Sequence, residues 1–86
     1  MTDRDVDESA RMMVAYWGER IERARKAKRR DDGKPWAQQD LADALNTDQA
    51  QVSKWERGIQ EPKLATKYAI AQALGVPADV LFPTMP

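Results

Sequence analysis

The sequence predicts a small all-α protein, and three observations support this fold class. Apolar residues recur at steps of three and four along the chain, which is the spacing of one face of a helix. No segment shows the alternation of Val, Ile and Thr that is typical of strands. Apart from Gly18, the few glycines and prolines stand outside the periodic segments and so mark boundaries. With 86 residues, the chain is expected to form one domain.

The first helix is expected to begin near residue 8 and to end at Arg29 or Arg30. Asp7 or Ser9 can cap it, and acids near its start with bases near its end complement the helix dipole. Its inward-facing residues are predicted from their spacing to be Met13, Trp17, Ile21 and Ala24. Gly18 lies inside this helix, where it either costs about 1 kcal/mol relative to Ala or marks a bend or joint.

A loop and two short helices follow. Residues 29–35, RRDDGKP, contain a glycine and a proline and are predicted to form a loop. The second helix is expected over about 37–45 and is ended by Asn46 in the left-handed conformation. Asp48 is a favourable N-cap for a third helix, which is expected to run to Arg57.

Glycine and proline also delimit the last two helices. Gly58 is a natural residue to end the third helix, and Pro62 suits the first turn of a fourth, which ends at Gly75. The inward-facing positions of the fourth helix are predicted to be Leu64, Ala65, Tyr68, Ala71 and Leu74. Pro77 opens a short fifth helix, and residues 83–86 are expected to form a loose tail.

Composition argues against several classes of function. The chain has no Cys, and therefore no disulfide or thiolate, and it has no His, the commonest general base and metal ligand. No pattern pairs its carboxylates in a pocket, so we expect no catalytic residues, no metal site and no cofactor. No apolar run approaches the ~20 residues of a membrane span, and the acidic N-terminus is unlike a signal peptide. A cytoplasmic protein is therefore expected.

The net charge is zero, but the charges are unevenly distributed. Residues 1–19 carry five acids and two bases, a net of −3, and residues 35–86 carry six acids and four bases, a net of −2. Residues 20–34 carry eight bases and three acids, a net of +5. This basic stretch is either a solvated helix face, as most charge runs are, or a surface that faces phosphates.

Residues 37–82, AQQDLADALNTDQAQVSKWERGIQEPKLATKYAIAQALGVPADVLF, resemble the helix-turn-helix of the phage Cro and CI repressor family. "QQDLA" resembles the opening of the family's second helix, "VSKWERG" the close of its recognition helix, and "ALGVPADVLF" its last two helices. The resemblance covers residues 19–82 and implies a five-helix, lambda-repressor-like domain there. Residues 1–18 are then an N-terminal extension, helical from about residue 8, that lengthens the first helix.

The resemblance implies which residues read DNA. The recognition helix of such a motif enters the major groove with its N-terminal residues at the base edges, which places Gln49, Ala50 and Gln51 nearest the bases. Lys54 follows one turn later. Glutamine can pair with adenine, lysine can donate to guanine, and the alanine methyl suits the methyl of thymine. The alternative is that these are ordinary exposed residues of a helix.

A second group of polar residues is expected at the DNA backbone. The family often uses a glutamine at the start of the second helix to hold a phosphate and brace the recognition helix, and Gln38 stands there. The connection before it is longer than is usual in the family, and its bases could contact phosphates or a minor groove, or could lie in a disordered loop. The expected backbone contacts are Gln38, Ser53, Arg57, Gln60, Arg29, Arg30 and Lys34.

Two further features follow from the resemblance. In the family an Arg of the first helix often pairs with a Glu near the end of the recognition helix, which implies an Arg25–Glu56 ion pair here; the alternative is an exposed, unpaired Glu56. The turn departs from the family pattern, because Asn46 stands in place of Gly and Thr47 in place of an apolar residue. Asp48 replaces a neutral cap and brings a negative charge toward the DNA backbone.

The sequence therefore predicts a sequence-specific regulator of transcription that binds double-stranded DNA and is not an enzyme. We expect a small Cro-like repressor in a bacterial cell or phage-infected host, acting by occupancy of a pseudo-palindromic operator, with no membrane or small-molecule ligand. A homodimer is expected at least on DNA, since one recognition helix reads few base pairs. The alternative is an antitoxin or adaptor whose main partner is a protein. The apolar N-terminal residues Met12, Met13, Tyr16 and Trp17 favour a subunit or partner contact.

Overall fold

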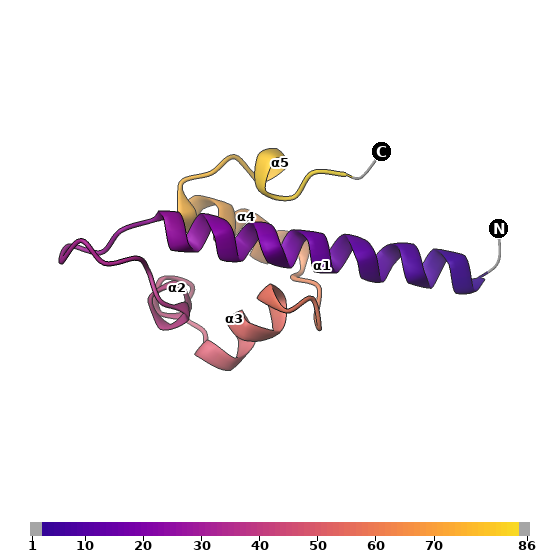
Figure 1. The fold of residues 1–86 in the computed structure, drawn as a ribbon, viewed down its shortest axis with the longest axis horizontal. Helices are drawn as coiled ribbons and strands as arrows, with labels where there is room; N and C mark the ends of the chain where they lie inside the picture. Colours follow the sequence, from indigo (N-terminus) through magenta and orange to yellow (C-terminus); the bar gives the residue numbers. More distant parts are fainter. Residues whose placement is uncertain (1–2, 85–86) are drawn as a thin grey trace.

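The structure, a computed structural model, describes residues 3–84, with side chains from residue 6 (Figure 1). These residues form five helices and no strand, as the sequence predicted. The helices are α1 (Asp3–Ala27), α2 (Gln38–Ala44), α3 (Gln49–Glu56), α4 (Leu64–Leu74) and α5 (Ala78–Leu81). No helix within residues 3–84 is long and apolar enough to cross a membrane.

α1 runs along most of the length of the molecule, and the other helices pack around its C-terminal half. Figure 1 shows α2 and α3 on one side of α1 and α5 on the other, and α1 contacts α3, α4 and α5. The N-terminal half of α1 extends beyond the remaining helices, and the molecule measures 50 × 24 × 20 Å. The fold thus separates a compact five-helix body from a projecting helical arm.

The core lies between the C-terminal half of α1 and the four shorter helices. Each helix contributes at least one buried apolar side chain, and burying one such large side chain stabilises the fold by about 1.5–3 kcal/mol. The buried residues are Ile21, Leu41, Ala42, Val52, Trp55, Ile70, Ala71, Leu74 and Leu81. The core therefore joins α2 and α3, which form the helix-turn-helix, to α1 and α4.

The bounds of α1 differ from the prediction at both ends. The helix begins at Asp3 rather than near residue 8, because no glycine or proline interrupts residues 3–17 and the potential caps Asp7 and Ser9 lie inside it. It ends at Ala27, before the predicted Arg29 or Arg30. There the Trp36 N–H donates to the Lys28 carbonyl at 2.9 Å, which draws the chain back toward α2.

Gly18 is neither a bend nor a joint, because α1 continues through it (Figure 1). A Cβ at Gly18 would lie 2.5 Å from the Trp55 carbonyl oxygen and 2.5 Å from that of Glu56. Gly58, at φ 70°, makes a similar approach from the other side, since its Cβ would lie 2.7 Å from the Cα of Ala15. The two glycines let the end of α3 rest directly on the backbone of α1.

The turn between α2 and α3 follows the local rules that predicted it. Asn46 has φ 56°, the left-handed conformation expected of the residue that ends α2. The side chain of Asp48 accepts a hydrogen bond from the Gln51 N–H at 2.8 Å and so caps α3. At the start of α2, the Ala37 N–H donates to the Asp40 carboxylate at 2.6 Å.

The buried face of α4 was predicted only in part: Ala71 and Leu74 are buried as expected, but Leu64, Ala65 and Tyr68 are exposed. Leu64 and Tyr68 are 70% and 62% exposed, and the buried residues are Ile70, Ala71 and Leu74. The sequence LATKYAIAQAL has apolar residues around much of its circumference, so spacing alone does not select one face. Contact with α1, α2 and α5 selects it instead. Pro62 also precedes the helix, which begins at Leu64, rather than lying in its first turn.

The first residue of the predicted loose tail is held in place. The Trp17 indole N–H donates to the Pro83 carbonyl at 2.8 Å, and its ring meets that of Phe82 edge-on with centroids 6.0 Å apart. Trp17 therefore fastens the segment after α5 to α1. The predicted tail also includes residues 85–86, which lie outside the described part of the chain.

Candidate nucleic-acid interface

The eight residues of α3 divide into a buried and an exposed face. Val52 and Trp55 are buried and point into the core. The residues predicted to read bases lie on the other face, where Gln49, Ala50 and Lys54 are exposed and Gln51 is half-buried. Ser53 is half-buried and Arg57 is exposed at the end of the helix. α3 therefore presents a polar face that packing does not use.

Arg25 and Glu56 form a buried ion pair between α1 and α3. The Arg25 Nε lies 2.7 Å from Glu56 Oε2 and its Nη2 lies 2.9 Å from Oε1, while Nη1 donates to the Trp36 carbonyl at 2.7 Å. The side chains are 8% and 2% exposed. The hydrogen bond to Glu56 raises the pKa of Arg25 above its usual value, so the guanidinium stays charged. The predicted partners thus lie together.

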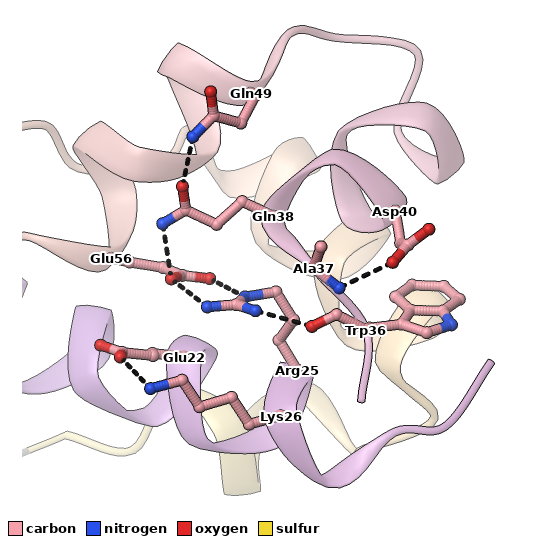
Figure 2. A network of polar contacts seen from close by, with 9 residues as sticks. All are labelled: Glu22, Arg25, Lys26, Trp36, Ala37, Gln38, Asp40, Gln49 and Glu56. Atoms are coloured by element: carbon pink, nitrogen blue, oxygen red, sulfur yellow. Dashed lines mark hydrogen bonds and ion pairs between the residues drawn. The ribbon is translucent and has the colours of Figure 1, made fainter. Parts of the chain in front are cut away.

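A chain of hydrogen bonds leads from this ion pair to the first residue of α3 (Figure 2). The Gln38 Nε2 donates to Glu56 Oε1 at 3.0 Å. The Gln38 Oε1 in turn accepts from Gln49 Nε2 at 2.6 Å. Gln38 therefore connects the start of α2 to the start of α3, and the amide of Gln49 is held at the surface where α3 begins.

A second pair of glutamines joins α3 to the segment that follows it. The Gln51 Nε2 donates to Gln60 Oε1 at 2.9 Å. The backbone turns back at this point, with the Ile59 and Gln60 N–H groups donating to the Lys54 carbonyl at 2.9 and 3.4 Å. Sequence reasoning placed Gln60 at the DNA backbone but missed its contact with Gln51. No sequence signal indicates a contact that depends on how the chain folds after Gly58.

Residues 29–35 form a hydrogen-bonded turn rather than a disordered loop. Arg29 and Pro35 pair as an isolated bridge, and the Arg30 N–H donates to the Lys34 carbonyl at 2.8 Å. The Gly33 N–H donates to the Arg30 carbonyl at 2.9 Å. Gly33 has φ 85°, a conformation that favours glycine. The turn joins α1 to α2 at one end of the body (Figure 1).

The charges of this turn are partly paired. The Arg30 Nη2 lies 2.8 Å from Asp32 Oδ2, and Asp40 approaches the same guanidinium at 3.8 Å. The hydrogen bond from Arg30, aided by the Lys34 N–H, lowers the pKa of Asp32, so this carboxylate is ionised at neutral pH. Arg29 and Lys34 are exposed at the same turn.

Comparisons with known proteins place this arrangement in context. Residues 21–81 match the family model described as "Helix-turn-helix". Among solved structures, the chain is similar to the restriction-modification controller protein C.AhdI from Aeromonas hydrophila, with 26% sequence identity and a TM-score of 0.71. The similarity covers 84% of this chain and 96% of that chain. No curated protein matches the chain.

Proposed function

The chain belongs to the helix-turn-helix family of DNA-binding transcription regulators, and from this premise we propose that it is a repressor that reads a specific operator with α3. It is a regulator rather than an enzyme. The observation that carries the proposal is the exposed polar face of α3, on which Gln49 is held by Gln38 at the start of α2. Such positioning of a polar side chain serves recognition, since packing does not need it.

The proposed mode of reading follows from the chemistry of this face. The N-terminal end of α3 enters the major groove, where Gln49 and Gln51 each offer amide groups to a purine. Lys54 donates to guanine, and Ala50 contacts the methyl of thymine. Because Gln49 has one N–H committed to Gln38, its remaining N–H and its oxygen match the N7 and N6 groups of adenine.

Phosphate contacts are proposed to fix the protein on the duplex without reading sequence. The ordered turn of residues 29–35 supports this proposal, because it displays basic side chains beside the N-terminal end of α2. Arg30 would exchange Asp32 for a phosphate on binding. The residues proposed to contact the backbone are Gln38, Ser53, Arg57, Gln60, Arg29, Arg30 and Lys34.

We propose that two copies bind a pseudo-palindromic operator, because a single recognition helix reads too few base pairs for specificity. The surface proposed for the second copy lies on α4 and α5. There Leu64 and Tyr68, one helical turn apart on α4, are 70% and 62% exposed, and Val80 on the neighbouring α5 is 48% exposed, which suits a contact with another protein surface. Repression would then follow from occupancy of the operator, with the concentration of the protein as the control.

A protein partner is the second candidate, and the projecting half of α1 favours it. Val6 and Met12, on this half, are 51% and 57% exposed. This arm lies beyond the compact body of the fold (Figure 1). An antitoxin or adaptor of the same fold would use such a surface to hold another protein.

The experiment that tests the proposed function is selection of bound duplexes from a random pool at moderate salt. We expect a motif with two half-sites about one helical turn apart. A single half-site would contradict binding as two copies, and no enrichment would overturn sequence reading and favour the protein partner. The recovered site, placed over a promoter that drives a reporter, should lower transcription when the protein is present. Higher transcription would contradict repression.

A further inference from the structure

The two glutamines of α3 differ in what holds their amide groups. We infer that Gln49 is restricted to one arrangement of donor and acceptor, which selects adenine, whereas Gln51 can present two arrangements, and that Gln60 sets the choice between adenine and guanine. This inference rests on the proposed reading of DNA by α3. It assigns Gln60 a role as a positioning residue in specificity, beyond any contact with phosphate.

The chemistry of the amide explains why its orientation decides which base is read. A glutamine side chain carries two N–H donors and one acceptor oxygen. When one N–H is donated to a protein neighbour, one donor and the acceptor remain, which match N7 and the N6 amino group of adenine. When the oxygen instead accepts from the neighbour, two donors remain, which match O6 and N7 of guanine.

The amide of Gln49 can take only one orientation, because the chain of hydrogen bonds that holds it ends on the Glu56 carboxylate. The Glu56 carboxylate forms an ion pair with the Arg25 guanidinium, and a carboxylate can only accept hydrogen bonds. Gln38 must therefore turn its NH₂ group toward Glu56 and its oxygen toward α3. Gln49 must then donate to Gln38. Turning over either amide would set two acceptors or two donors against each other in a partly buried site.

The amide of Gln51 is paired with another amide rather than with a charge. Within the described residues, the side chain of Gln60 hydrogen-bonds to Gln51 alone, and Gln60 is exposed. If both amides turn over together, the hydrogen bond between them persists with its direction reversed. The pair thus has two states of similar energy, and Gln51 offers an acceptor and a donor in one and two donors in the other.

Two substitutions at Gln60 select one state each. In Gln60→Glu the new carboxylate only accepts, so Gln51 must donate to it and present the arrangement that suits adenine. In Gln60→Lys the ammonium only donates, so Gln51 must accept and present two donors to guanine. We expect the adenine-to-guanine ratio at the base read by Gln51 to rise at least about fivefold in the first variant and to fall by a similar factor in the second.

The measurement is selection from a random duplex pool with the full chain and both variants. The base read by Gln51 is identified as the position at which Gln51→Ala loses preference. Gln72→Glu and Gln72→Lys, at an exposed site on α4, supply the same changes of net charge. They should alter overall affinity but leave the ratio unchanged. The base read by Gln49 should be the same for every variant, and circular dichroism should verify that each remains folded.

The outcomes separate this inference from the proposed function. If the unmodified chain enriches no motif, the proposed function fails and the inference falls with it. If a motif is recovered but the Gln60 variants leave the ratio unchanged, or move it in the same direction, only the inference is overturned. A single fixed base at the position read by Gln51 in the unmodified chain would also contradict the two-state pair, whereas a mixture of adenine and guanine there supports it.

Discussion

At the scale of single residues, the buried ion pair of Arg25 and Glu56 joins α1 to α3. Both side chains are nearly removed from water, and the guanidinium satisfies Glu56 and the Trp36 carbonyl together. Burial makes such a pair costly to break, because the remaining charge has no solvent to stabilise it. The pair therefore holds α3 against α1 at one defined position.

Arg25→Ala should lower the free energy of unfolding by about 3–5 kcal/mol, since it leaves the Glu56 carboxylate buried without its partner. Urea unfolding followed by circular dichroism measures this loss. Lys26→Ala is the matched control, because it removes an ion pair with Glu22 in which both side chains are exposed. The control should cost less than about 1 kcal/mol. Equal losses in the two variants would contradict the importance of burial.

Gln49→Ala should weaken specific binding by about 1–3 kcal/mol and relax base choice at one position of the operator. The reason is that the substitution removes the amide that Gln38 positions, while the residues proposed to contact phosphates remain. Binding to the selected site and to a scrambled duplex measures both effects. Gln39→Ala, which removes an exposed amide bonded to Asp43 on α2, is the control. If affinity for both duplexes falls alike, Gln49 does not read a base.

At the scale of the elements, the contact between α1 and α3 depends on two backbones meeting. Gly18 and Gly58 lie where a side chain would collide with backbone atoms. Helix propensity alone treats Gly18 as a defect, whereas its position makes it the site at which the end of α3 rests on α1. The orientation of α3 therefore depends on a residue outside the helix-turn-helix.

Gly18→Ala tests this point, because helix propensity and the close contact with α3 predict opposite changes in the free energy of unfolding. Helix propensity favours alanine by about 1 kcal/mol. The added Cβ would lie 2.5 Å from two carbonyl oxygens of α3, so we expect the free energy of unfolding to fall instead. Urea unfolding of the variant and of the unmodified chain gives the sign. A more stable variant would show that α3 moves away from α1 at little cost.

The turn of residues 29–35 yields a prediction about salt. Arg29→Ala with Arg30→Ala should weaken binding to all sequences alike and reduce the slope of log affinity against log salt by about one unit per lost phosphate contact. Binding to operator and scrambled duplexes over a range of salt concentrations measures the slope. Arg11→Ala, on the projecting half of α1, should leave the slope unchanged. An unchanged slope in the double variant would show that Arg29 and Arg30 contact no phosphate and that the turn serves only as a spacer.

At the scale of the whole molecule, α1 separates two surfaces with different chemistry. The polar face of α3 lies on one side, and the exposed apolar side chains of α4 and α5 belong to elements packed elsewhere around α1 (Figure 1). The zero net charge conceals an uneven distribution of charge, because residues 1–19 and 35–86 together offset the basic residues 20–34. We therefore expect DNA binding to depend on where charge is placed rather than on its sum.

Tyr68→Glu should dissociate the proposed dimer, since it places a charge in the apolar surface of α4. Sedimentation equilibrium should give the mass of one chain, and binding to a two-half-site operator should weaken. The fold should persist because Tyr68 is 62% exposed. Met12→Glu, on the arm of α1, should leave the mass unchanged. If Met12→Glu dissociates the dimer and Tyr68→Glu does not, the second copy binds the arm instead.

The sequence by itself determined the features that act over a few residues. The all-α class, the left-handed Asn46 and the cap at Asp48 follow from backbone sterics and hydrogen bonds within one turn, so they need no knowledge of the rest of the chain. Tertiary structure decided that Ile70 rather than Tyr68 faces the core, because α4 is apolar around much of its surface and only its neighbours distinguish the faces. It also brought Gln60 to Gln51, a contact set by the fold of the backbone after α3 rather than by any local preference.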